Sequence, residues 1–357
     1  MKIVTILGAR PQFVKAATVS RELTKVGLQE VIIHTGQHFD HALSQVFFDE
    51  MEIPNPHYNL DVSGLSHGAM TGRMLEKIEE VLLKEKPDCV MVYGDTNSTL
   101  AGALAASKLH IPIAHVEAGL RSFDMKMPEE INRILTDRIS KILFCPTQGA
   151  INNLTNEGFN HFNCLIELVG DVMLDAVLYY KEKSKNVSKI LNTRQLVGKK
   201  FVLATLHRAE NTNDTNRLRS ICEAFNEIHK DTTVVLPLHP RTRNYLQSNN
   251  IPLHVQVIDP VGYLDMLSLL HNCQLVLTDS GGLQKEAYFF GKYCITLRDQ
   301  TEWVELVQEN ANSIVGADKD TILRDVERAK YKSVTFNPLL YGKGDASQKI
   351  AALLKQS

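Results

Sequence analysis

The sequence has no excess charge of one sign, no long apolar run and no closely paired cysteines. Its 39 Lys and Arg nearly balance 41 Asp and Glu, and a net charge of −2 argues against a nucleic acid or an anionic membrane as partner. No apolar run reaches the roughly 20 residues that a membrane-spanning helix needs. The six cysteines form no C-x-x-C pair, so zinc is not expected. We expect a cytoplasmic protein with reduced thiols and no signal peptide before its first strand.

The motifs of several common enzyme classes are also missing. There is no G-x-S-x-G, no H-E-x-x-H and no paired Asp that would indicate a metal. The first strand-to-helix turn, Gly8-Ala9-Arg10-Pro11, lacks the G-x-G-x-x-G spacing of a dinucleotide site and the Gly-Lys-Ser/Thr of a P-loop. We therefore expect neither a metal nor a redox cofactor.

A chain of 357 residues is too long for one ordinary core and predicts two domains. Short apolar runs alternate with helical patterns in both halves, which is typical of parallel, doubly wound sheets. The prediction is an α/β protein with two Rossmann-like domains, 1–175 and 176–340, and a helical segment 341–357 that can return to the first domain. The predicted strands are 3–7, 30–34, 89–93, 111–116 and 142–145, then 201–205, 233–236, 255–258, 275–277 and 293–297.

Three acidic residues lie where ligands are expected. Asp95 and Glu117 directly follow apolar runs, and Glu129 stands in Met-Pro-Glu-Glu. Open α/β sheets bind ligands at the carboxyl ends of their strands, and crowded carboxylates can do proton chemistry because their pKa values are pushed apart. Each acid alone could equally be a helix cap or a solvated loop residue. All three together, near Arg121 and Arg133, favour proton transfer.

Two strand-to-helix turns have the features of phosphate sites. Arg10 begins a helix with Pro11 at its first position, and a guanidinium beside free backbone N–H groups suits a diphosphate. Lys15, one turn on, can add charge. In the second half Ser280-Gly281-Gly282 follows a strand and permits close backbone approach. Glu286 can accept hydrogen bonds from ribose hydroxyls. A nucleotide diphosphate across the cleft between the domains would satisfy both turns, whereas a surface arginine and an ordinary helix start are the structural alternatives.

Basic side chains follow two strands of the second half. His207 and Arg208 come directly after residues 201–205, and we expect them to contact the ligand. His239 is a weaker case of the same argument. The single tryptophan, Trp303, lies in a loop after a strand, where wall of a pocket and packing at an interface are equally good interpretations.

As an ordered set, these motifs resemble the non-hydrolysing UDP-N-acetylglucosamine 2-epimerase family over essentially the whole chain. The resemblance implies the two-domain glycosyltransferase-B (GT-B) architecture, a homodimer and UDP held between the domains. It rests on Gly8-Ala9-Arg10-Pro11, Tyr93-Gly94-Asp95-Thr96, His115-Val116-Glu117-Ala118-Gly119-Leu120-Arg121, Pro128-Glu129-Glu130, His207-Arg208 and Asp279-Ser280-Gly281-Gly282.

The resemblance also implies a reaction and the residues that perform it. A base removes the proton at C2 of the sugar, UDP leaves from C1, and UDP adds back to the glycal after reprotonation of C2 on the opposite face. The implied catalytic residues are Asp95, Glu117, Glu129 and His207, with Glu130 ranked below Glu129. The implied substrate and UDP contacts are Arg10, Lys15, Arg133, Arg208, His239, Met266, Ser280, Gly281, Gly282 and Glu286.

Three segments depart from the usual family pattern. The first turn reads Arg10-Pro11-Gln12 where Arg-Pro-Glu is usual, and the late loop reads Thr301-Glu302-Trp303-Val304-Glu305 where Thr-Glu-Arg-Pro-Glu is usual. Members with a second, activating UDP-sugar carry Gln-His-Arg, and here the residues are Gln37-His38-Phe39-Asp40.

Three segments look more like the branch that acts on UDP-2,3-diacetamido-2,3-dideoxy-glucuronate for surface polysaccharide. They are Ala9-Arg10-Pro11-Gln12-Phe13, Arg121-Ser122-Phe123 and Thr301-Glu302-Trp303. A hydrolysing 2-epimerase, a GT-B glycosyltransferase and a UDP-sugar binding module are the alternatives. Three acids in one domain favour epimerisation over transfer and over simple binding, since neither of these requires them together.

Overall fold

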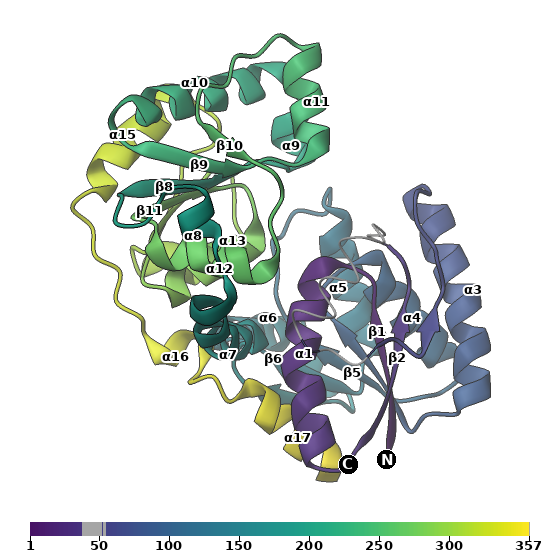
Figure 1. Ribbon diagram of the computed structural model, residues 1–357. Coiled ribbons are helices and arrows are strands. Elements are labelled where there is room, and N and C mark those ends of the chain that lie inside the picture. Colours follow the sequence, from purple (N-terminus) through teal and green to yellow (C-terminus); the bar gives the residue numbers. More distant parts are fainter. Residues whose placement is uncertain (38–51, 53–54, 357) are drawn as a thin grey trace. The chain divides into compact units, whose positions relative to one another are not determined.

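The computed structural model describes residues 1–37, 52 and 55–356. The chain divides into two units, which Figure 1 shows in sequence colours. The first unit contains Met1–Leu178 and Pro338–Ser357, and the second contains Tyr179–Asn337. We propose that these units are the two domains expected from the sequence. His38-Phe39-Asp40, which bear on the activator site, lie outside the described residues.

Buried apolar runs form the strands of the first unit, because a parallel sheet covered on both faces has no polar face. β4 (Cys89–Tyr93) and β5 (Ile113–Val116) are buried along their whole length. All strands pair in parallel, in the order β3-β2-β1-β4-β5-β6-β7. The order reverses between β1 and β4, which makes this pair the topological switch point where such sheets bind ligands. The other strands are β1 (Lys2–Leu7), β2 (Gln29–His34), β3 (Tyr58–Asn59), β6 (Ile142–Cys145) and β7 (Leu165–Leu168).

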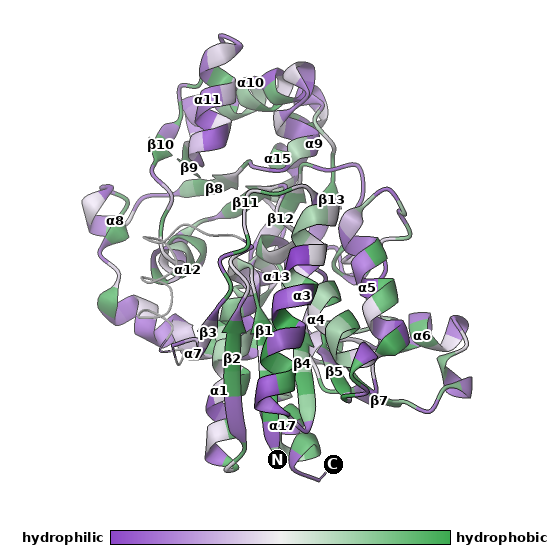
Figure 2. Ribbon diagram, turned by 90° about the vertical axis from the view of Figure 1, so that its right-hand side faces the viewer, coloured by the Kyte–Doolittle hydropathy of each residue, from purple (hydrophilic) through white to green (hydrophobic). Residues whose placement is uncertain are grey.

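Helices cover both faces of this sheet. α3 (His67–Glu85) and α4 (Asn97–Lys108) pack on one face and share a core with β1, β2 and β4. α1 (Arg10–Lys25) lies on the opposite face (Figure 1), and β1 and β4 stand out as hydrophobic in Figure 2. Further helices in the described part of this unit are α5 (Pro128–Ile139), α6 (Gln148–Asn156), the 3-10 helix Phe159–His161, α16 (Pro338–Tyr341) and α7 (Val172–Val187), which continues into the second unit.

The last helix of the chain, α17 (Ala346–Gln356), belongs to the first unit and contacts α1. Its first turn is capped by Asp175 of α7, whose carboxylate accepts from the backbone N–H groups of Ala346 at 3.3 Å and Ser347 at 2.7 Å. These bonds satisfy donors that a helix start otherwise leaves without an intrahelical partner. The chain therefore leaves the first unit through α7 and returns to it at its end.

The second unit repeats the doubly wound plan with a six-stranded parallel sheet. Its order is β10-β9-β8-β11-β12-β13, so its switch point lies between β8 and β11. Residues after these two strands therefore share one end of the sheet. The strands are β8 (Phe201–Thr205), β9 (Thr233–Pro237), β10 (Gln256–Ile258), β11 (Leu275–Thr278), β12 (Tyr293–Thr296) and β13 (Asn312–Ile314).

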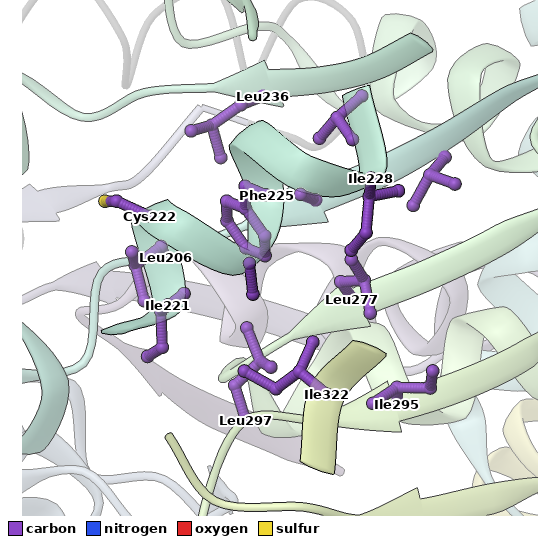
Figure 3. Close-up of a cluster of buried hydrophobic side chains, with 14 of the residues drawn as sticks. Leu206, Ile221, Cys222, Phe225, Ile228, Leu236, Leu277, Ile295, Leu297 and Ile322 are labelled. Carbon is purple, nitrogen blue, oxygen red and sulfur yellow. The ribbon is translucent and has the colours of Figure 1, made fainter. Parts of the chain in front are cut away.

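An amphipathic helix covers one face of this second sheet. α10 (Thr215–Asp231) buries the side chain of Phe225 against Leu236 of β9 and Leu277 of β11, as Figure 3 shows. Its buried residues recur every three or four positions, the spacing of one helix face. The other helices here are α8 (Ile190–Thr193), α9 (Ala209–Thr212), α11 (Pro240–Ser248), α12 (Tyr263–Asn272), α13 (Gly281–Phe289), α14 (Val304–Gln308) and α15 (Lys319–Ala329).

The sequence predicts the inner strands and misses three edge strands. β3 and β7 bound the first sheet and β13 bounds the second. Each has a single neighbour, is two to four residues long and is at least partly exposed, so none appears as a buried apolar run. The strand predicted from 111 begins at Ile113 in the structure. None of the helices in the described part of the chain has the length and hydropathy needed to span a bilayer.

Candidate active site

The switch point of the first sheet brings together the ends of β1 and β4, with β5 beside them. Gly94 and Asp95 follow β4, and Glu117 follows β5. The N–H of Gly94 donates to the carbonyl of Val116 at 3.0 Å, and those of Glu117 and Ala118 donate to the carbonyl of Phe144 at 3.1 Å. These bonds continue the sheet pairing into the turns, so the two acids stand on firmly held backbone.

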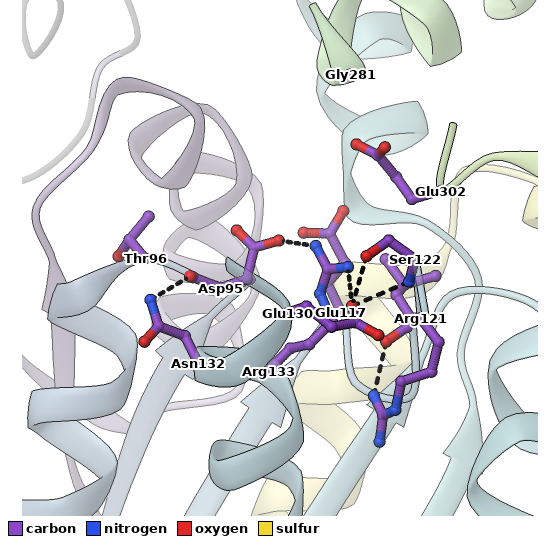
Figure 4. Close-up of polar contacts among 12 residues, drawn as sticks. Asp95, Thr96, Glu117, Arg121, Ser122, Glu130, Asn132, Arg133, Gly281 and Glu302 are labelled. Atoms are coloured by element: carbon purple, nitrogen blue, oxygen red, sulfur yellow. Dashed lines mark hydrogen bonds and ion pairs between the residues drawn. The ribbon is translucent and has the colours of Figure 1, made fainter. Parts of the chain in front are cut away.

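Asp95 is held by helix α5. Its carboxylate forms an ion pair with Arg133, whose side chain is 5% exposed, and its backbone carbonyl accepts from Asn132 Nδ2 at 2.9 Å (Figure 4). Consecutive residues of α5 thus fix both the side chain and the backbone of Asp95. The carboxylate is 32% exposed and so is accessible to a small ligand.

Glu117 is held by helix α1 and adopts a rare backbone conformation. Its carboxylate pairs with Lys15, and the two side chains are 8% and 9% exposed. Its φ of 74° lies in the left-handed region, which costs a residue with a Cβ about 1–2 kcal/mol. Gly94 lies against this pair at φ 63°, and a Cβ there would stand 3.2 Å from Glu117 Oε2. Such strain gathers at functional sites, so the conformation supports a chemical role for Glu117.

A buried charge network supports the segment that carries Glu117. Both ring nitrogens of His115 lie 2.7 Å from an oxygen atom, Nδ1 from Asp137 Oδ1 and Nε2 from the Gly94 carbonyl. Asp137 also accepts from Arg121 at 2.7 Å and from the Gly119 N–H at 3.1 Å. Burial raises the pKa of Asp137, but hydrogen bonds and charges from His115 and Arg121 outweigh it, and the pKa lies below its ordinary value.

Arg121 donates hydrogen bonds from all three of its guanidinium nitrogens in this network. Its Nε and Nη2 donate to the two oxygens of Glu157 at 2.6 and 2.8 Å, and its Nη1 donates to Asp137 and to the Leu120 carbonyl. Burial lowers the pKa of Arg121, but the hydrogen bonds and charges of Glu157 and Asp137 raise it above its ordinary value. Arg121 therefore supports the loop.

The two neighbouring glutamates at the start of α5 differ in their surroundings. Glu130 is 1% exposed and accepts from the N–H and hydroxyl of Ser122, the N–H of Phe123 and Nη1 of Arg133, at 2.7 to 3.0 Å. Arg133 thus joins Glu130 to Asp95 (Figure 4). Glu129 lies in the same turn and is partly exposed. Glu130 acts as a structural clamp, whereas Glu129 can meet a ligand.

In the second unit, one buried carboxylate joins the two turns at the switch point. Asp279, which follows β11, accepts from the backbone N–H groups of His207 at 3.0 Å and Arg208 at 2.9 Å, which follow β8. It also accepts from Asn211 Nδ2 at 3.3 Å. The His207 side chain is 48% exposed, with Nδ1 3.6 Å from Asp279. The structure therefore holds the His207-Arg208 backbone in place and leaves the imidazole accessible.

The turn after β11 begins helix α13 at Gly281. The Gly281 carbonyl accepts from Trp303 Nε1 at 2.9 Å, and a Cβ on Gly281 would lie 2.4 Å from Glu302 Oε1. Lys285 Nζ stands 4.0 Å from the centre of the Trp303 ring. Trp303 is therefore packed under the turn rather than lining an open surface. A helix start with glycine at its first positions can present backbone N–H groups to an anion.

The remaining predicted contacts lie on other helices. His239 caps α11, where its Nδ1 accepts from the Arg241 N–H at 3.2 Å. Met266 on α12 is partly buried against the second-unit core. Glu286 is buried on α13. The pKa of Tyr263 is raised, mainly by burial of Tyr263 and in addition by the carboxyl group of Glu286. Arg10 begins α1, and its side chain lies outside the described part of the structure.

Sequence reasoning missed two residues that position the site. Gln12 bonds the turn after β1 to the turn after β4, and Asp137 holds the segment around Glu117. The sequence does contain a pattern that indicates a role for Gln12, because Gln at the third helical position is half of a capping box. Asp137 had none in the chain pattern, because its partners are 16 to 22 residues away. Within the described residues, no cluster of three or more His, Cys, Asp and Glu could hold a metal ion.

We expect Asp137→Asn to lower the free energy of unfolding at pH 7 by about 3 kcal/mol, because it breaks a buried ion pair. The pKa of Asp137 is lowered in the folded state, so its stabilisation is present above the ordinary value of 3.8 and is lost as pH falls through the folded value. The difference in the free energy of unfolding between parent and variant should therefore become smaller at acidic pH. Urea unfolding as a function of pH measures this.

The matched control is Asp259→Asn, since Asp259 is 80% exposed in its ion pair with Arg243 and should contribute little. An Asp137→Asn protein that unfolds at the parent's urea midpoint at pH 7 contradicts the role given to the network.

Comparison with known proteins gives one consistent result. The model of the family described as UDP-N-acetylglucosamine 2-epimerase matches residues 21–355. UDP-2,3-diacetamido-2,3-dideoxy-D-glucuronate 2-epimerase of Pseudomonas aeruginosa is 58% identical over 356 residues, which cover 99% of each chain. UDP-N-acetylglucosamine 2-epimerase of Escherichia coli K12 is 34% identical, covering 100% of this chain and 99% of its own.

Solved structures agree with the sequence relatives. The crystal structure of Methanocaldococcus jannaschii UDP-GlcNAc 2-epimerase in complex with UDP-GlcNAc and UDP matches with a TM-score of 0.93 and 44% identity over 100% of both chains. The Neisseria meningitidis UDP-GlcNAc 2-epimerase bound to UDP-GlcNAc matches at 0.90 and 32% identity, again over 100% of both chains. The predicted α/β fold of GT-B type is confirmed. The chain belongs to the UDP-N-acetylglucosamine 2-epimerase family.

Proposed function

We propose that this enzyme, a UDP-sugar 2-epimerase by family, inverts C2 of UDP-2,3-diacetamido-2,3-dideoxy-glucuronate by elimination and re-addition of UDP. The observation that carries the chemistry is the pair of anchored carboxylates, Asp95 and Glu117, at the strand ends of the first sheet. The observation that favours this substrate is the 58% identity to the Pseudomonas aeruginosa enzyme of that name, against 45% to the Methanocaldococcus jannaschii enzyme named for UDP-N-acetylglucosamine.

The reaction proceeds in two balanced halves. A carboxylate accepts the C2 proton while the bond between C1 and the diphosphate oxygen breaks, and the electron pair of the C2–H bond becomes the C1–C2 double bond of a glycal. UDP leaves with the electrons of the C1–O bond. In the second half UDP re-forms its bond to C1, and C2 receives a proton on the opposite face. The product is the manno epimer with its UDP intact.

Inversion requires a proton acceptor on one face of C2 and a donor on the other, so more than one acid is needed. Asp95, Glu117 and Glu129 fill this requirement, and a positioned general acid or base contributes about 10²–10⁴-fold. Arg133 and Lys15 hold the first two carboxylates in fixed positions. Fixed positions matter because the reacting atoms must already be aligned when UDP departs.

Departure of UDP needs positive charge at the diphosphate, because the C2 proton is only weakly acidic. We assign Arg10, His207 and Arg208 to this role, with the backbone N–H groups at Ser280-Gly281-Gly282. Lys15 and Arg133 already pair with carboxylates, so a diphosphate contact from either would be additional. His239, Met266 and Glu286 remain predicted contacts of the UDP group.

One experiment tests activity and substrate together. The enzyme is incubated in D₂O with UDP-2,3-diacetamido-2,3-dideoxy-glucuronate and, separately, with UDP-N-acetylglucosamine, and C2 is followed by NMR. We expect deuterium at C2 of an intact UDP-sugar, faster for the diacetamido substrate. Faster exchange with UDP-N-acetylglucosamine would overturn the substrate. Free UDP with free sugar would indicate a hydrolysing enzyme. An absence of deuterium exchange with both substrates would exclude epimerisation of either.

We expect Glu117→Gln and Asp95→Asn each to lower kcat by about 10²–10⁴-fold while UDP affinity stays close to the parent's. The reason is that both changes remove a proton acceptor but keep the side-chain shape. Turnover by NMR and UDP binding by calorimetry measure the two effects. Glu182→Gln, at an exposed ion pair with Lys185, is the control. A Glu117→Gln enzyme with the parent kcat would show that its assigned role is wrong.

We propose that the protein is a homodimer, as its family resemblance implies. Light scattering coupled to gel filtration should give twice the chain mass of 40.1 kDa. A mass of one chain across the micromolar range would exclude this assembly.

We also propose that it works in the cytoplasm. All six cysteines are free thiols, which fits a reducing compartment. Burial raises the pKa of Cys89 and Cys222 to about 12, so these thiols are unreactive and structural. Cell fractionation that places the protein outside the cytoplasm would contradict the assignment.

A further inference from the structure

Gln12 is a buried side chain that the reaction scheme above does not use. It lies at the third position of α1, 2% exposed, directly after the Gly8-Ala9-Arg10-Pro11 turn. Its Oε1 accepts from the backbone N–H groups of Gly8 at 2.8 Å and Ala9 at 2.9 Å. The second of these bonds is one arm of a capping box, which fixes the first turn of the helix.

The other end of the same amide reaches the turn after β4. Gln12 Nε2 lies 2.7 Å from the Tyr93 carbonyl and 3.0 Å from the hydroxyls of both Thr96 and Thr99. Tyr93 ends β4 and Thr96 is the N-cap of α4, so these acceptors bracket Asp95. Every polar atom of the Gln12 side chain is therefore used, and each end serves a different turn.

The two turns are pressed together where Gln12 joins them. A Cβ on Gly8 would lie 2.0 Å from Ser98 Oγ on α4, so only glycine fits at the end of β1. This contact lies between β1 and β4, at the switch point of the sheet. The two turns are therefore closely packed, and a displacement of one turn would shift the other through the Gln12 amide.

We propose that Gln12 is a positioning residue that sets the distance between the Arg10 turn, assigned to the diphosphate, and the Asp95 turn, assigned to proton transfer. The inference rests on the proposed function, because it takes its two ends from that scheme. Breaking the C1–O bond and transferring the C2 proton occur on adjacent atoms. A shift of one turn against the other therefore misaligns both events, and a displacement of 1 Å can cost on the order of 10²-fold in rate.

The geometry also explains why an amide suits this position. A carboxylate could accept from Gly8 and Ala9 as the amide does, but its second oxygen would face the Tyr93 carbonyl, which has no hydrogen to donate. The Thr96 and Thr99 hydroxyls can rotate to donate, whereas the carbonyl cannot change. A carboxyl group here must hold a proton to replace the amide N–H, and burial raises the pKa of such a group.

The test compares Gln12→Met and Gln12→Glu with the parent, using kcat, KM and UDP affinity. Gln12→Met removes all five hydrogen-bond contacts at similar volume and should lower kcat on the order of 10²-fold and weaken UDP binding. Gln12→Glu should restore most of the kcat at about pH 6 and lose it relative to the parent toward about pH 9, as the new carboxyl deprotonates. Circular dichroism confirms that each variant is folded at the assay temperature.

The matched control is Asn226→Asp in the second unit. The Asn226 amide likewise accepts from one backbone N–H, that of His254, at 2.7 Å and donates to one backbone carbonyl, that of Pro252, at 3.0 Å. Asn226 lies within helix α10 and not in a turn that follows a strand of either switch point. Its kcat relative to the parent should not vary with pH. This control separates a general loss of stability from misalignment of the site.

The outcomes distinguish this inference from the proposed function. The positioning role is overturned if Gln12→Met has the kcat of the parent, or if the ratio of kcat between Gln12→Glu and the parent is constant with pH. Neither result affects the proposed epimerase activity. A parent without C2 exchange removes the epimerase scheme, and UDP affinity then decides whether Gln12 positions the Arg10 turn. Unchanged UDP affinity in Gln12→Met would then overturn the inference as well.

Discussion

A charge can be buried in a protein only if it is paired, and this constraint organises the site of the first unit. Asp137 is completely buried between His115 and Arg121, and Arg121 also pairs with Glu157. Removing one member would leave an uncompensated charge, which costs several kcal/mol. The segment from His115 to Arg121 is consequently fixed, and these neighbouring residues determine the position of Glu117 within it.

The two units reach the same end by different means. The first unit adds ion pairs between side chains, at Asp95 and Glu117, to side-chain bonds that accept from backbone N–H groups. The second unit holds its turns with one carboxylate, Asp279, that accepts from backbone N–H groups. This arrangement leaves the side chains of His207 and Arg208 available to a ligand while their backbone is fixed. The acids that we propose for proton transfer and the cations that we propose for the diphosphate thus both stand on anchored turns.

The inner strands and the strand-end acids could be predicted from the sequence because their signals are local. A buried run such as Cys89–Tyr93 is apolar throughout, and the residue that follows it must lie at the sheet edge. The edge strand Leu165–Leu168 could not be predicted, because half-exposed residues leave no buried run. Partners distant in the chain could not be predicted either: Lys15 pairs with Glu117, 102 residues away, in addition to the phosphate contact that the sequence predicts for it. Nothing in the sequence of either residue signals such a pair.

The backbone of Glu117 bears on the chemical role that we propose for its side chain. Glycine would take its φ of 74° without the cost of about 1–2 kcal/mol that a side chain pays. The chain already uses glycine at the neighbouring left-handed positions, Gly94 and Gly119. A carboxylate at this position therefore carries a backbone cost that glycine would avoid. Its pairing with Lys15 and the bonds around Asp137 offset the strain, and what the protein gains is an acid held at the switch point of its sheet.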